Sequence, residues 1–453
     1  MIIAAVLVFL WIDLTGTGLF PMAPNTGAPS VAALKQFDYL LHVLLALVVV
    51  IIVARVVGGL FKYMHQPPVI GEVIGGIMLG PSLLGRLAPD IYAYVLPTNA
   101  APFLGVIAQL GVILYMFLVG LELDLKIIRN SGHAALAISH ASIVAPFLLG
   151  SGLALWIYPN LAPHGISFTS FALFLGVSMS VTAFPVLARI LTDKKLNKTT
   201  LGAVALTCAA IDDITAWCLL ALVISVVQST IPNAISTVGL TLVYIVIMFV
   251  VVKPIIKRGV LGLEHLTRVS ESEMAVIFVS ILLSALATEL IGIHAIFGAF
   301  LLGVIIPHDS RAAHDLTHRL DDMVRILFLP AFFAFTGMRT QVGLLNSFDD
   351  WAICGVIIVV ATIGKFGGTW IAAKLSGLSW RDSTGLGILM NTRGLVELIV
   401  LNIGLDLGVI SPRLFTMLVI MALATTFMAG PALALVIDTK NITPAKPQPQ
   451  TAL

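Results

Sequence analysis

Two neighbouring carboxylates stand in the middle of an otherwise apolar stretch of this chain. In "TCAAIDDITAWCLLALVISV", Thr207 to Val226, Asp212 and Asp213 are the only charged residues. A carboxylate at the centre of a membrane-spanning helix costs roughly 2.5–3.5 kcal/mol. Neighbours on a helix point about 100° apart, so one carboxylate can face a partner helix while the other faces a cavity. Adjacent acids repel, and one of them can then trade a proton for a cation. The pair, Asp212 and Asp213, therefore predicts a site at which a metal cation and a proton are exchanged.

A positive charge lies equally deep in another apolar run. "VVATIGKFGGTWIAAKL" places Lys365 around ten residues from either end of its span, which is about 15 Å along a helix. A lysine can snorkel to water only near the end of a span. We therefore expect Lys365 to form an ion pair with one of the two aspartates.

Two further apolar runs are interrupted by polar residues. In "GVSMSVTAFPVLARI", Ser180 and Thr182 precede Pro185, which removes a backbone donor. In "LMNTRGLVELI", the interruption begins at Asn391. Broken helices expose carbonyl groups and dipole ends that can coordinate a small cation. Thr182, Ser180 and Asn391 are therefore expected to support the ion site, although such hydroxyls can also simply bond back to their own helix.

Three more ionisable residues in apolar surroundings need a role. Arg393 and Glu397 are four residues apart on a helix, so we expect them to pair with each other and to compensate helix dipoles without touching the ion. Glu72, in "PPVIGEVIGGIMLGPS", is either a secondary ion-binding or pH-sensing residue, or a structural group hydrogen-bonded near a helix start.

The composition sets the class of protein. Of the 453 residues 59% are hydrophobic and 11% are charged, against about 25% charged in soluble domains. The chain is therefore an all-α polytopic membrane protein whose surroundings are the lipid bilayer. A net charge of +2 indicates no nucleic-acid partner, and the three cysteines lie inside apolar runs. We expect no cofactor, and a transporter in place of an enzyme.

Apolar runs long enough to cross a roughly 30 Å hydrocarbon core predict thirteen spans. The run "MIIAAVLVFLWI" at the N-terminus is either a fourteenth, marginal span or an interfacial segment. An N-terminus outside and a C-terminus in the cytoplasm put most of the 25 Lys and Arg residues on the cytoplasmic side. The spans lie near 38–61, 68–85, 101–121, 134–157, 167–190, 200–228, 233–253, 273–291, 294–307, 324–343, 351–375, 384–405 and 412–436.

The sequence also contains an internal repeat. "PVIGEVIGGIMLGP" has a counterpart in "HAIFGAFLLGVIIP", and "SMSVTAFPVLARI" has one in "GILMNTRGLVELI". Spans one to six thus match spans eight to thirteen, and the single span between them inverts the second half. Inverted repeats with broken spans in matching positions are typical of secondary transporters with a midplane site.

Four ordered motifs carry a family resemblance. "SMSVTAFPVLARIL", "AAIDDITAW", "IGKFGGTW" and "NTRGLVELIVLNIG" resemble the monovalent cation:proton antiporter-2 family, over essentially all of residues 38–436. The resemblance implies a homodimer in which each protomer has a dimerisation domain and a mobile six-helix core with crossed broken helices. It matches Asp213 to the ion-binding acid and Lys365 to the lysine that pairs with Asp212.

The resemblance implies the following division of the chain. Residues 1–37 are an N-terminal segment of uncertain placement, and 437–453 are a short cytoplasmic tail. The dimerisation domain takes 38–133 and, with a connector helix, 229–343. The core takes 134–228, with a broken helix near 178–186, and 344–436, with a second one near 390–397.

These observations lead to one expected function and several rivals. The expected function is the exchange of Na⁺, or alternatively K⁺, for H⁺ by alternating access across a bacterial-type inner membrane. A cation channel and a sodium-coupled organic-anion symporter are the alternatives that stay open. An intramembrane aspartyl protease is disfavoured because its two aspartates must come from separate helices.

Overall fold

The structure is a computed structural model that describes residues 39–64, 66–122, 133–194, 196, 199–228, 231–263, 270–307 and 310–436. Mutual contacts divide the chain into a unit of residues 1–41 and a unit of residues 42–453. The account below concerns the second unit. The segments expected at 1–37 and 437–453 lie outside the described residues.

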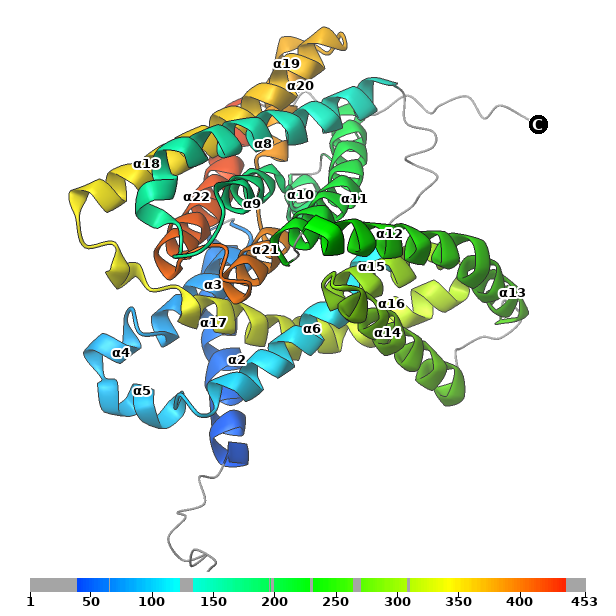
Figure 1. Cartoon of the computed structure of the whole chain (residues 1–453), viewed down its shortest axis with the longest axis horizontal. Helices are drawn as coiled ribbons and strands as arrows, with labels where there is room; N and C mark the ends of the chain where they lie inside the picture. Colours follow the sequence, from blue (N-terminus) through cyan, green and yellow to red (C-terminus); the bar gives the residue numbers. More distant parts are fainter. Residues whose placement is uncertain are drawn as a thin grey trace, which may run out of the picture. The chain divides into compact units, whose positions relative to one another are not determined.

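All regular structure in the described ranges is helical, and the helices pack in two groups joined by a connecting stretch (Figure 1). The first group contains short helices and close crossings. Its members are α2 (Tyr39–Tyr63), α3 (Pro68–Leu79), α4 (Leu84–Leu87), α5 (Pro89–Val95), α6 (Ala101–Glu122), α14 (Glu271–Ile291), α15 (Ala295–Ile305), α16 (Arg311–Met323), η3 (Val324–Phe328) and α17 (Leu329–Arg339).

The second group surrounds the two aspartates. Its members are α8 (His133–Leu161), α9 (Phe168–Ser180), α10 (Phe184–Asp193), α11 (Thr200–Gln228), α18 (Phe348–Thr362), η5 (Ile363–Gly367), α19 (Gly368–Leu375), α20 (Trp380–Met390), α21 (Leu395–Asp406) and α22 (Pro412–Val436). Between the groups in sequence come α12 (Ile231–Ile247), η2 (Met248–Val252) and α13 (Lys253–Leu263), and the short η4 (Val342–Leu344) leads from α17 to α18.

The apolar helices fit a membrane protein. Ten helices of the described ranges are long and apolar enough to cross a bilayer, or eleven if the bent pair of α20 and α21 is one span. The chain is therefore a helical polytopic membrane protein, with ten to eleven such spans in its described ranges. Two expected spans fall short as helices, because α15 and α17 have 11 residues each. The count of thirteen stays a prediction.

Two crossings hold the first group together, and both depend on glycine. Where α3 crosses α17, a Cβ on Gly76 would lie 2.7 Å from the Cα of Ala334. Where α6 crosses α15, a Cβ on Gly120 would clash with the carbonyl oxygen of Phe300, and one on Gly303 would clash with that of Phe117. Small residues allow helix backbones to approach closely in membranes, where van der Waals packing drives association.

The α6–α15 crossing gives the first prediction. Gly120→Ala should lower the melting temperature of the purified protein, because its methyl group would force the two helices apart. Gly239→Ala in α12 is the matched control, since nothing lies within 4 Å of a Cβ there. Alanine is normally better than glycine in a helix by about 1 kcal/mol, so the control should be neutral or stabilising. Equal melting temperatures for both variants would contradict the crossing.

Candidate ion-exchange site

Two helices of the second group are interrupted at the same place. The chain unwinds between α9 and α10 at Val181–Ala183, and between α20 and α21, which are bent by 42°, at Asn391–Gly394. The unwound segments touch, because the amide of Ala183 donates to the carbonyl of Thr392 at 3.1 Å. Pro185 at the start of α10 has no amide hydrogen to offer the preceding turn, which explains the first break. The breaks bring four helix ends together in the protein interior.

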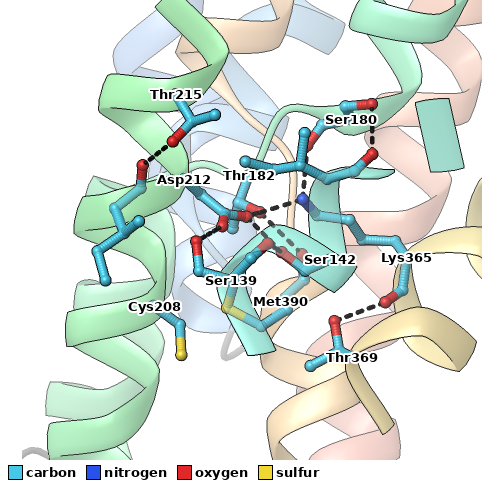
Figure 2. A network of polar contacts seen from close by, with 12 residues as sticks. Ser139, Ser142, Ser180, Thr182, Cys208, Asp212, Thr215, Lys365, Thr369 and Met390 are labelled. Atoms are coloured by element: carbon cyan, nitrogen blue, oxygen red, sulfur yellow. Dashed lines mark hydrogen bonds and ion pairs between the residues drawn. The ribbon is translucent and has the colours of Figure 1, made fainter. Parts of the chain in front are cut away.

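Asp212 lies beside this crossing and is fully hydrogen-bonded (Figure 2). Its Oδ1 accepts from the hydroxyl of Ser139 at 2.5 Å. Its Oδ2 accepts from Ser142 at 2.7 Å, from Thr182 at 2.8 Å and from Nζ of Lys365 at 2.9 Å. The donors come from α8, from the unwound segment after α9 and from η5. Asp212 thus ties three other elements to α11.

Lys365 is completely buried and donates hydrogen bonds to two acceptors. Nζ forms the ion pair with Asp212 and also donates to the carbonyl of Ser180 at 2.5 Å. The residue lies in η5, a single π-helical turn between α18 and α19. Such turns occur often at functional sites because they change the direction of side chains inside a continuous helix. The geometry is the ion pair expected for a lysine too deep to reach water.

Arg393 and Glu397 form a second buried pair at the crossing. Nη1 of Arg393 lies 2.9 Å from Oε2 of Glu397, and both side chains are fully buried. The same guanidinium donates to the carbonyls of Ser178 at 3.0 Å and Met179 at 2.6 Å. Together with Lys365 it therefore covers the last carbonyls of α9, where the helix dipole is negative.

Asp213 differs from its neighbour in every contact. It is fully buried, yet neither carboxylate oxygen has a hydrogen-bond partner among the described residues. Its charge interacts with those of Asp212 and Lys365, and with the phenol of Tyr115 on α6. A buried carboxylate without partners is unstable as a bare anion, so it needs a proton or a cation. Among the described residues of the site, Asp213 is the carboxylate with both oxygens unsatisfied.

Only some of the other residues expected at the ion site lie beside Asp212 in the structure. Thr182 contacts Asp212 directly, whereas the Ser180 hydroxyl bonds back to Gly176 at 2.7 Å and only its carbonyl enters the site. Oδ1 of Asn391 is buried and has no partner within the described chain. Glu72 is not at the crossing. It lines a cavity of about 250 Å³ between α3, α6 and α10.

Ser139 and Ser142 were missed at the sequence level. They lie in "AISHASIV" of α8, where a serine is ordinary because it can bond to its own helix. Their three-residue spacing places both on one face of α8 towards Asp212, and this was the available signal.

The Asp212–Lys365 pair gives the second prediction. Removing one partner of a buried ion pair typically costs about 3–5 kcal/mol. We expect Lys365→Met to lower the melting temperature strongly, and Asp212→Asn combined with Lys365→Met to recover most of the loss. A double-mutant cycle of melting temperatures measures this. Additive losses would show that the two charges do not stabilise each other.

Known proteins are similar to this chain over most of its length. The family model described as "Sodium/hydrogen exchanger, transmembrane" matches residues 32–438. The chain is 45% identical over 394 residues to the Na⁺/H⁺ antiporter NhaS4 of Synechocystis, covering 86% of this chain and 96% of that protein. It is 40% identical to cation/H⁺ antiporter 20 of Arabidopsis thaliana and 37% identical to K⁺/H⁺ antiporter 1 of Saccharomyces cerevisiae. The two alignments cover 84% and 85% of this chain, respectively. They cover only 47% of the Arabidopsis protein and 45% of the yeast protein.

A solved structure is similar in fold. The sodium proton antiporter MjNhaP1 of Methanocaldococcus jannaschii superposes with a TM-score of 0.52 at 13% identity, over 88% of this chain and 96% of that one. The resemblance found in the four motifs is thereby confirmed. The chain belongs to the sodium/hydrogen exchanger family of transmembrane proteins.

Proposed function

We propose that this protein exchanges a monovalent cation, Na⁺ or alternatively K⁺, for protons, and that both compete for Asp213. The observation that carries the proposal is the contrast between the two neighbours. Asp212 receives four donors, while Asp213 is buried with both oxygens unpaired among the described residues. Relatives named as Na⁺/H⁺, cation/H⁺ and K⁺/H⁺ antiporters support the same activity.

The balance of buried charge supports a monovalent substrate. Among the described residues, five side chains that carry a charge at neutral pH in water lie fully or almost fully buried around the crossing. Three are carboxylates and two are cations: Asp212, Asp213, Glu397, Lys365 and Arg393. In their ionised forms they sum to one negative charge, because three negative and two positive charges are present. One proton or one monovalent cation neutralises the cluster, and a neutral cluster can move through a low-dielectric region at the least cost.

Thr182, Ser180 and Asn391 supply the remaining oxygens in this proposal. The carbonyl of Ser180 accepts from Lys365, the hydroxyl of Thr182 donates to Asp212, and the amide oxygen of Asn391 is a buried acceptor without a described partner. Lys365 stays with Asp212 while the cation is absent and is released when it binds. Arg393 and Glu397 compensate the helix ends.

Two cavities support access from either side. One of about 250 Å³ reaches Tyr115, Pro185 and Leu395, at the first turns of α10 and α21. Since Pro185 and Leu395 lie within two residues of the unwound segments, this cavity leads towards the crossing. Another of about 320 Å³ lies between α6, α17 and the far end of α21, around Asn402 and Asp406. Both lie between the two helix groups, which would slide past each other.

The finer architecture is part of the proposal. Thirteen spans form two inverted six-helix repeats, and the glycine contacts support this. Gly76 of α3 meets α17 and Gly303 of α15 meets α6, which are the pairs that a two-fold repeat would exchange. The first helix group corresponds to the dimerisation domain and the second to the core. We further propose a homodimer in a bacterial-type inner membrane, with the N-terminus outside and the C-terminus in the cytoplasm.

Glu72 takes a secondary part in this proposal. Its carboxylate lines the cavity that leads to Tyr115, together with Arg55 and Arg189. In that position it can meet the cation before Asp213 does, without being a ligand of the final site.

Asp213→Asn gives the third prediction. In proteoliposomes with a pH gradient, wild type should collapse the gradient when Na⁺ or K⁺ is added, and the variant should not. The variant should keep at least the wild-type melting temperature, because it replaces a buried carboxylate that has no partners in the described chain. Asp90→Asn, an exposed change on α5, is the control and should behave like wild type.

The rivals make different predictions in the same assay. Cation flux without proton counter-flow in wild type would replace antiport by a channel. Proton-independent uptake of an organic anion with sodium would indicate the symporter.

A further inference from the structure

Asp213 shares one face of α11 with Trp217. The two residues are four positions apart, which places their side chains one above the other on a helix. Both are buried, with 0% and 3% of their surface exposed. Asp212 points about 100° away, into its own hydrogen-bond network. Trp217 is therefore the neighbour that continues the Asp213 face along the helix axis.

The polar groups of these two residues are complementary and both unsatisfied. The Asp213 oxygens lack a donor, and the indole Nε1–H of Trp217 lacks an acceptor, within the described residues. Other atoms at the crossing, Nε of Arg393, Oε1 of Glu397 and Oδ1 of Asn391, also lack partners among the described residues, but Trp217 is the one that lies one helical turn from Asp213 on the same face. An unmet donor one turn from an unmet carboxylate points to a shared occupant.

The chemistry of an indole limits what it can do. Its nitrogen donates one hydrogen bond and accepts none, so it cannot be a ligand of a cation. It can donate to a carboxylate oxygen, or to a water molecule that a partly dehydrated cation keeps. The ring itself is held in place, because it packs on Phe300 of α15 with ring centroids 6.2 Å apart. Its N–H is thus fixed in direction by a helix of the other group.

We propose that Trp217 is a positioning residue for the exchanged cation. Its indole N–H orients the Asp213 carboxylate, directly or through a water molecule of the ion, so that the free oxygen faces the cation. The inference rests on the proposed function, because it assigns Trp217 a role only if Asp213 binds the cation. Within the described residues, Asp213 interacts electrostatically with Asp212 on the same helix, Lys365 on η5 and Tyr115 on α6, and none of them donates a hydrogen bond to it.

The role differs from simple packing in what it predicts. Loss of the N–H should weaken cation binding and leave the movement of the helix groups intact. Loss of the ring should disturb the contact with Phe300 and slow the movement. A variant that removes the hydrogen while keeping the ring separates the two.

The test replaces Trp217 by β-(3-benzothienyl)alanine, which keeps the bicyclic shape and substitutes sulfur for N–H, and in parallel by Phe. Initial rates of cation-driven proton movement in proteoliposomes are measured against cation concentration. We expect the apparent KM to rise about tenfold in the benzothienyl protein, as for the loss of one hydrogen bond to a charged group, with the maximal rate unchanged within about twofold. Trp370→Phe is the control, because its N–H donates to Thr384 at 3.2 Å away from the aspartates, and its KM should stay that of wild type.

A second readout does not depend on transport. Added cation should raise the melting temperature of wild type, since a ligand stabilises the state that binds it. The rise should be smaller in the benzothienyl protein at the same cation concentration.

The outcomes separate the inference from the proposed function. An unchanged KM, or a fall in maximal rate alone, in the benzothienyl protein would overturn the positioning role while exchange at Asp213 stands. Cation-independent proton movement in wild type, or full exchange by Asp213→Asn, would overturn the proposed function and this inference with it.

Discussion

The burial of one ion pair organises the second helix group. Asp212 and Lys365 are both fully buried, and charges in that position are tolerated only when each is paired and hydrogen-bonded. Asp212 receives the additional hydrogen bonds that it needs from Ser139 and Ser142 of α8 and from Thr182 of the unwound segment after α9. α8, α9, α11 and η5 must therefore keep a fixed relation to one another. A shift of any one of these elements would leave part of the polar centre unsatisfied.

The same requirement explains how two broken helices survive inside a membrane protein. Breaking α9 and α20 leaves carbonyl groups without amide partners, which is costly where no water can replace them. Arg393 and Lys365 cover the carbonyls of Ser178, Met179 and Ser180 with positive charge. Glu397 then balances Arg393, as Asp212 balances Lys365. All compensating charges are matched in this arrangement, and Asp213 is left as the excess.

The sequence predicts the charged members of the site better than the neutral ones. Asp212, Asp213, Lys365 and Arg393 stand out because a charge in an apolar run is expensive and needs a reason. Ser139 and Ser142 are uncharged, so the sequence does not mark them as members of the site. Ser180 was expected there for its hydroxyl, but its carbonyl enters the site instead. Hydropathy also predicts spans better than their internal geometry. The sequence predicts the all-helical fold and the two interrupted helices. The π-helical turns and the helices α4, α5 and α16 depend on tertiary contacts, which the pattern of apolar runs does not reveal.

Glycines on both sides of Lys365 allow its helix to pack closely against α8. Gly364 approaches Pro146 and Gly368 approaches Ala141 and Ala145, so that η5 and the start of α19 lie directly against α8. A Cβ on Gly364 would lie 2.7 Å from the Cα of Pro146, so any larger residue would push the helices apart. At this short separation the short serine side chains of α8 and the long side chain of Lys365 reach the same carboxylate. If α8 lay farther away, Asp212 would lose two of its four donors, including the one on Oδ1. The close packing of α8 on η5 therefore widens the chemical difference between the two adjacent aspartates.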